Sequence, residues 1–160
     1  MLDLLFTLAM GGAAAACVGA HRLTGTDRTA DLAVGACAVV LFGAATELAT
    51  RLTGFEFSRF PMLDLVALIL FWSGHRAAPA QWKADLVFLI TGLLGVHAWF
   101  WALSDHGARA EWTYVLLKNI LFGAQLAVLT LTGGVALVRA SRDRRDVPGR
   151  CAGADLGGLP

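Results

Sequence analysis

The sequence predicts an all-α fold, a bundle of apolar helices embedded in a lipid bilayer. Hydrophobic residues make up 57% of the 160 positions, and the mean hydropathy is +0.64, so the chain is more apolar than soluble domains usually are. Charged residues make up only 16%, which is low for a globule that must cover itself with water-facing side chains. Most of these charges lie between long apolar runs rather than within them, as expected where the runs cross hydrocarbon.

Four apolar runs are long enough to cross a bilayer as helices. A hydrocarbon core of about 30 Å takes about 20 residues, and backbone groups in lipid need hydrogen-bond partners within their own segment. The four runs are residues 4–20, 30–50, 82–103 and 112–138. Aromatic residues near the ends of the last two runs are expected to be interface anchors, with packing between helices as the alternative. They are Trp82, Trp99, Trp101, Trp112 and Tyr114.

A fifth apolar segment, residues 60–73, leaves the number of crossings open. Pro61 suits a first helical turn and Gly74 suits a helix C-cap, which frames about 14 residues and roughly 21 Å of helix. This length is too short to cross comfortably. We favour five transmembrane helices, because the two framing residues define a complete helix. The alternative is four transmembrane helices plus one re-entrant segment, which is tolerated where protein or water covers the backbone.

The distribution of Lys and Arg predicts the orientation, because cytoplasmic connections carry the excess. With five crossings, one side holds nine basic residues: Arg22, Arg28, Arg76, Lys83, Arg139, Arg142, Arg144, Arg145 and Arg150. The other side holds three, namely Arg51, Arg59 and Arg109. With four crossings, Arg51 and Arg59 replace Arg22 and Arg28 on the more basic side. The count is again nine against three. We therefore predict a transmembrane domain over residues 1–140 and a cytoplasmic tail over 141–160, first basic, then Gly-rich and disordered.

Small residues at four-residue spacing predict close helix packing in the first two runs. Gly11, Ala15 and Gly19 follow one another in the first run, and Gly35 and Gly43 lie in the second. Such residues let helix backbones approach closely in lipid, within one chain or between copies. The expected partners are therefore the lipid bilayer and either a second copy or another membrane protein. The uneven charge is a topology signal, and no nucleic-acid partner is expected.

Polar residues within the apolar runs are the candidate functional residues, because such groups are costly in hydrocarbon. They are Glu47, Asp64, His97, Lys118, Asn119, Gln125 and Thr132. Five crossings would place the first five in the outer half of the membrane. Lys118, Gln125 and Thr132 recur every seven residues and form a polar stripe. With Asp64 as a partner for Lys118, this stripe predicts a pore lining or a proton or ion relay.

The same residues also have structural interpretations. Lys118 can extend its ammonium to the outer interface, and Glu47 with Arg51 makes an ordinary i,i+4 pair. A single membrane histidine such as His97 is more often a hydrogen-bonded packing residue than a ligand. These interpretations predict that the polar groups only hold helices together.

No motif in the chain predicts an enzyme, a metal site or a cofactor. The three cysteines show no CxxC or Cys/His ligand spacing, and haem would need a second histidine at the depth of His97. The tripeptide Ser73-Gly74-His75 is similar to one motif of membrane lipid phosphatases, but the companion motifs are missing. We therefore expect a protein that is not an enzyme and binds no cofactor.

Three segments carry a resemblance to a known class of proteins. They are PMLDLVALILFW, then PAQWK before an apolar run that ends in HAWFW, and finally YVLLKNILFGAQL. Across residues 61–134 this pattern resembles small membrane proteins encoded by tailed phages and prophages. The resemblance implies a bacterial inner-membrane protein made by a phage, with holin-like permeabilisation or membrane interference as its function. Together with the charge distribution, this predicts a multi-pass protein of the inner membrane with its C-terminus in the cytoplasm. The alternatives are a structural or partner-binding membrane subunit and a small ion or proton channel or transporter.

Overall fold

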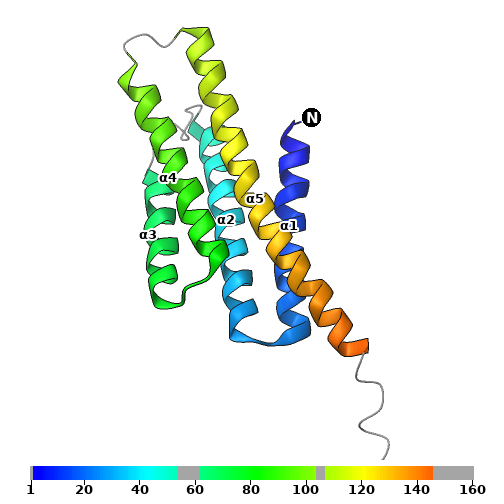
Figure 1. The fold of residues 1–160 in the computed structure, drawn as a ribbon. Helices are drawn as coiled ribbons and strands as arrows, with labels where there is room; N and C mark the ends of the chain where they lie inside the picture. Colours follow the sequence, from blue (N-terminus) through cyan, green and yellow to red (C-terminus); the bar gives the residue numbers. More distant parts are fainter. Residues whose placement is uncertain (1, 54–61, 104–106, 146–160) are drawn as a thin grey trace, which may run out of the picture.

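The chain forms a bundle of five α-helices in the computed structural model, which describes residues 2–53, 62–103 and 107–145 (Figure 1). The described residues contain no strand, so the predicted all-α class is confirmed. The helices are α1 (Leu2–Thr24), α2 (Asp27–Thr53), α3 (Met62–Ala77), α4 (Gln81–Ala102) and α5 (Ala108–Arg145). Three of them include segments long and apolar enough to cross a membrane, namely Asp27–Ala45, Gln81–Ala102 and Arg109–Asp143.

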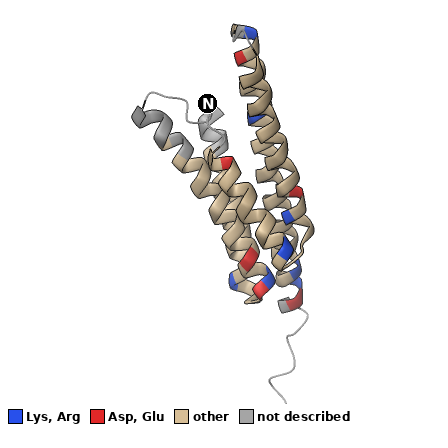
Figure 2. Ribbon diagram, turned by 90° about the vertical axis from the view of Figure 1, so that its left-hand side faces the viewer, with Lys and Arg blue, Asp and Glu red and all other residues tan. Residues whose placement is uncertain are grey.

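Successive helices run in opposite directions, so the bundle has two distinct ends (Figure 1). The α1–α2 turn, the α3–α4 turn and the C-terminal end of α5 lie together, and we call this the basic end. Its exposed arginines are Arg22, Arg28, Arg76, Arg139 and Arg142. Figure 2 shows most of the charged residues gathered there. At the opposite end α4 gives way to α5, beside the exposed side chains of Trp99, Trp101 and Trp112. We call this the tryptophan end.

Helix contacts close the bundle into a ring. Each helix packs on the next along the chain, and α5 returns to α1 in the most extensive contact. Small residues allow this last approach, because a Cβ added at Gly133 would lie 2.7 Å from Cys17 Sγ and 3.0 Å from its backbone nitrogen. The contact between α2 and α3 is slight by comparison. The position of α3 therefore depends mainly on α4.

Two predicted helix boundaries are wrong. The fifth segment is a helix of 16 residues that continues past Gly74 to Ala77, because the Gly74 carbonyl still accepts a hydrogen bond from Ala78 N at 3.0 Å. At the other end of the chain, α5 extends to Arg145. Residues 141–145 are therefore helical, although we expected them in the disordered tail. The rest of that tail lies outside the described residues.

The described surface of the bundle is unusually apolar. Large apolar side chains are exposed along several helices, including Val34, Leu41, Ile69, Phe88 and Leu131. The buried residues are also mostly hydrophobic, but they include a charged lysine, Lys83, together with His97, Gln125 and Thr29. Apolar side chains therefore cover much of the outside of the bundle as well as its core, as expected where lipid surrounds a protein.

Candidate functional site

A chain of three hydrogen-bonded side chains joins α3, α4 and α5 toward the tryptophan end. Asp64 comes from the first turn of α3, His97 from the second half of α4, and Tyr114 from the second turn of α5. His97 Nε2 lies 2.8 Å from Asp64 Oδ2, and His97 Nδ1 lies 2.9 Å from Tyr114 Oη. We call this set the Asp–His–Tyr chain.

The chemistry of the three groups determines which group donates each hydrogen bond in the Asp–His–Tyr chain. An ionised carboxylate only accepts hydrogen bonds, so a neutral imidazole in this position would donate Nε2–H to Asp64 and keep its lone pair on Nδ1. The Tyr114 hydroxyl then donates to that lone pair. His97 and Tyr114 are each only 1% exposed, whereas the Asp64 side chain is 30% exposed. Asp64 is therefore the member of the chain that meets the surface.

Aromatic and cationic groups surround Tyr114. Its ring packs on Phe100 of α4, with centroids 4.4 Å apart, and Lys118 Nζ lies 5.9 Å from the Tyr114 ring centroid. Asp64 therefore pairs with His97, whereas the sequence suggested Lys118 as its partner. Lys118 contributes a positive charge one helical turn from the tyrosine.

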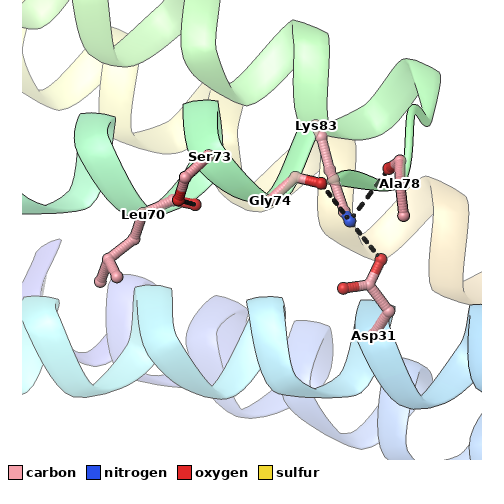
Figure 3. A network of polar contacts seen from close by, with 6 residues as sticks. All are labelled: Asp31, Leu70, Ser73, Gly74, Ala78 and Lys83. Atoms are coloured by element: carbon pink, nitrogen blue, oxygen red, sulfur yellow. Dashed lines mark hydrogen bonds and ion pairs between the residues drawn. The ribbon is translucent and has the colours of Figure 1, made fainter. Parts of the chain in front are cut away.

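A second polar cluster lies at the basic end and centres on Lys83 of α4 (Figure 3). Its ammonium donates to the carbonyl oxygens of Gly74 and Ala78 at 3.1 and 3.2 Å, and it forms a salt bridge with Asp31 of α2. An ammonium has three protons, so all three have acceptors. The two carbonyls lie at and just past the C-terminal end of α3, where a cation is favourable, and the Gly74 carbonyl also accepts from Ala78 N.

Together the two clusters fix both ends of α3 to α4. His97 binds Asp64 at the start of α3, and Lys83 binds the carbonyls at its end. The two α4 residues are 14 positions apart, about 21 Å along the helix, and the 16 residues of α3 span about 24 Å. The spacing of the polar residues on α4 thus matches the length of α3.

An apolar layer separates the two clusters. Between Lys83 and His97, the buried residues of α4 are Leu86, Val87, Ile90 and Leu93. Leu126 and Leu129 of α5 are buried in the same hydrophobic cluster as Leu86 and Ile90. The two polar clusters are therefore separate sites.

The polar stripe expected on the last helix is only partly turned inward. Gln125 is 5% exposed, and its Nε2 has no hydrogen-bond partner among the described residues. Thr132 is half-buried, and its hydroxyl donates a hydrogen bond to the Val128 carbonyl of the same helix at 2.7 Å. Lys118 and Asn119 are half-buried. Glu47 lies on α2, but its side chain is outside the described residues.

Of the small residues predicted to pack helices together, some lie at helix contacts and others lie on the exposed surface. A Cβ at Gly35 would lie 2.7 Å from the Trp82 ring, and one at Gly43 would lie 3.1 Å from Met10 Sδ and from Phe122. In α1, Gly19 approaches Leu137, but Gly11 and Ala15 are exposed. Among the α1 side chains that the structure describes, the buried ones are Ala13, Cys17 and Ala20.

Sequence reasoning missed Tyr114 and Lys83 as site residues. Both lie near the end of an apolar run, where an aromatic residue suggests an interface anchor and a lysine suggests a topology signal. In the structure Tyr114, Lys83 and Trp82 are buried, whereas Trp99, Trp101 and Trp112 are exposed. Lys83 directly follows Trp82, a large aromatic residue at the start of the apolar run. In the structure Trp82 packs against Gly35 of α2.

Comparisons of the chain with protein-family models, with curated proteins and with solved structures find no match. The geometry of the two clusters and the surface of the bundle are therefore the features from which we infer a function.

Proposed function

We propose that the protein is a multi-pass integral membrane protein that acts as a structural or partner-binding subunit. The observation that carries this proposal is the apolar exterior of the bundle. On α5, 27 residues separate Trp112 from Arg139, about 40 Å of helix, close to the thickness of a bilayer with its headgroup regions. The large side chains exposed between them are apolar: Leu116, Ile120, Leu131, Val135 and Val138.

The ends of the bundle suit the two interfaces of a bacterial inner membrane. The exposed tryptophans match the aromatic belt of one interface, and the exposed arginines match the cytoplasmic side of the other. In this orientation all five helices cross and the C-terminus is cytoplasmic. The short α3 crosses because α4 supplies partners for the polar groups at both of its ends.

The subunit role is favoured over a channel within a single copy. Lys83 and His97 use their polar atoms to hold neighbouring helices, and the apolar layer of Leu86, Ile90 and Leu129 lies between the two clusters. A polar path for ions would have to cross that layer. The exposed apolar faces of the helices are free to contact lipid, a second copy or another membrane protein.

Cysteine labelling in intact and permeabilised cells tests the topology. On a background without the native cysteines, Ala78→Cys reports the basic end and Gly107→Cys the tryptophan end, while Ser58→Cys reports the connection between α2 and α3. We expect an impermeant maleimide to label positions 58 and 107 in intact cells, and position 78 only after permeabilisation. Labelling of 58 together with 78 would instead support a re-entrant segment. Recovery of the protein in the soluble fraction would refute membrane insertion.

Holin-like permeabilisation by several copies is a second candidate. The specific observation in its favour is that Gly11 and Ala15 are exposed on α1, where a second copy could approach closely. Induced expression should then collapse the membrane potential, and Gly11→Leu should prevent the collapse while leaving the monomer intact. An unchanged potential at high expression would exclude this candidate and leave the subunit role.

A further inference from the structure

We propose that Asp64, His97 and Tyr114 form a proton-binding site in which uptake of one proton by His97 reverses its hydrogen bond with Tyr114. The site goes beyond the subunit role, because it makes the contact between α3, α4 and α5 depend on the acidity outside the bundle. It rests on the geometry of the Asp–His–Tyr chain and does not require a particular membrane orientation.

The geometry accommodates both protonation states without movement of heavy atoms. In the neutral state the Tyr114 hydroxyl donates to Nδ1, at 2.9 Å. When a proton from solvent binds the Nδ1 lone pair, imidazolium carries N–H groups at both positions. Nε2–H still donates to Asp64, and Nδ1–H now donates to Tyr114 Oη, so the tyrosine hydroxyl changes from donor to acceptor. No bond between heavy atoms forms or breaks.

The groups that face His97 favour a site of this kind. Two helices, α3 and α5, pack against α4 in extensive contacts. From α3, Asp64 supplies a carboxylate at 2.8 Å. From α5, Tyr114 supplies the hydroxyl, and Lys118 lies one turn further along. The partly exposed Asp64 connects the buried imidazole with the surface, and histidine is the side chain whose charge ordinarily changes between about pH 5 and 8.

Proton uptake would change how α3 is held. The bond from a neutral imidazole to the ionised Asp64 is already charge-assisted, and proton uptake adds the attraction between two opposite charges in a site shielded from water. Because α3 makes only slight contact with α2, its attachment near the tryptophan end depends on this bond. The attachment at Lys83 would stay unchanged, so protonation would tighten one end of α3 selectively.

The test uses the fact that Tyr114 is the only tyrosine in the chain. Full-length protein labelled with ¹³Cζ-tyrosine in detergent micelles gives a single NMR signal, and its shift reports whether the hydroxyl donates or accepts. We expect one sigmoidal change of this signal over the pH range in which the protein stays folded, and a flat profile in His97→Gln. The matched control is His75→Gln, on the last turn of α3, which should keep the wild-type profile.

Two results would overturn the proposal: a flat wild-type profile, or a profile that persists in folded His97→Gln. If that variant does not fold, ¹⁵N spectra of the histidine rings in wild-type protein decide the question. One of the four histidines should be the Nε2–H tautomer at high pH and become charged with the same midpoint as the tyrosine signal. Absence of such a histidine refutes the proposal and leaves the topology result unaffected.

Discussion

Replacing Lys83 with methionine tests whether the cluster at the basic end holds α2, α3 and α4 together. Methionine keeps the length and apolar stem of lysine but removes all three donors. The Gly74 carbonyl retains its bond from Ala78 N, whereas the Ala78 carbonyl loses a charge-assisted bond. Asp31, with a side chain 44% exposed, regains water, so its ion pair contributes little. We expect the free energy of unfolding to fall by about 1 to 3 kcal/mol.

The magnitude depends on two opposing terms. Lys83 is 3% exposed, so its removal also relieves the cost of burying an ammonium, which can offset the lost contacts. Bonds between neighbouring helices in lipid typically contribute about 0.6 kcal/mol each, so the two carbonyl contacts give about 1.2 kcal/mol, the lower end of the expected range. The retained methylene stem leaves the packing around Trp82 nearly unchanged.

Denaturant unfolding in detergent micelles, followed by far-ultraviolet circular dichroism, measures the effect. The matched control is Gln81→Ala, two positions earlier on α4, which loses an exposed i,i+4 hydrogen bond to Asp85 and should cost only about 0.3 kcal/mol. Adding Asp31→Asn to each background separates the ion pair from the carbonyl contacts. Equal stability of Lys83→Met and Gln81→Ala would refute the idea that Lys83 holds the end of α3.

Two further substitutions test the other contacts. Gly133→Ala should destabilise the bundle by about 1 to 3 kcal/mol, because the new Cβ meets the backbone of Cys17. Gly134→Ala, whose Cβ meets nothing within 4 Å, should be neutral or slightly stabilising in the same unfolding assay. Equal effects of the two would contradict the close packing of α1 on α5. Tyr114→Phe leaves His97 Nδ1 buried without its donor, which should cost about 1 to 3 kcal/mol; wild-type stability would show that this bond contributes nothing.

Much of the fold follows from hydrophobic runs alone. The four long runs predict four of the helices, and the pair Pro61 and Gly74 predicts that a fifth exists. The ends are less predictable, because they depend on contacts rather than on propensity. Gly74 resembles a C-cap in sequence, but Lys83 binds its carbonyl and that of Ala78 from a different helix. The Lys83 ammonium therefore supplies donors to the carbonyls at the end of α3, one turn later than the sequence indicates.

The candidate site was predictable in part. Asp64, His97 and Lys118 stand out because ionisable residues are rare in apolar runs. Their pairing could not be inferred, because the rotation of each helix about its axis determines which polar groups meet. The seven-residue stripe directed attention to α5 alone. The partner that completes the chain on that helix is Tyr114, which aromatic-belt reasoning assigned to the interface.

Two residues of α4, His97 and Lys83, hold the short helix α3 at its two ends. A lone helix of 16 residues, about 24 Å long, falls short of a hydrocarbon core of about 30 Å and carries Asp64 at its start and His75 and Arg76 at its end. On α4, His97 and Lys83 lie at the spacing that meets both ends. His97 supplies the partner of Asp64, and Lys83 binds the carbonyls at the other end of α3. The charge of Lys83 is in turn paired with Asp31 of α2. Under the proposed topology, the polar groups at the two ends of α3 therefore depend on α4 directly and on α2 through Lys83.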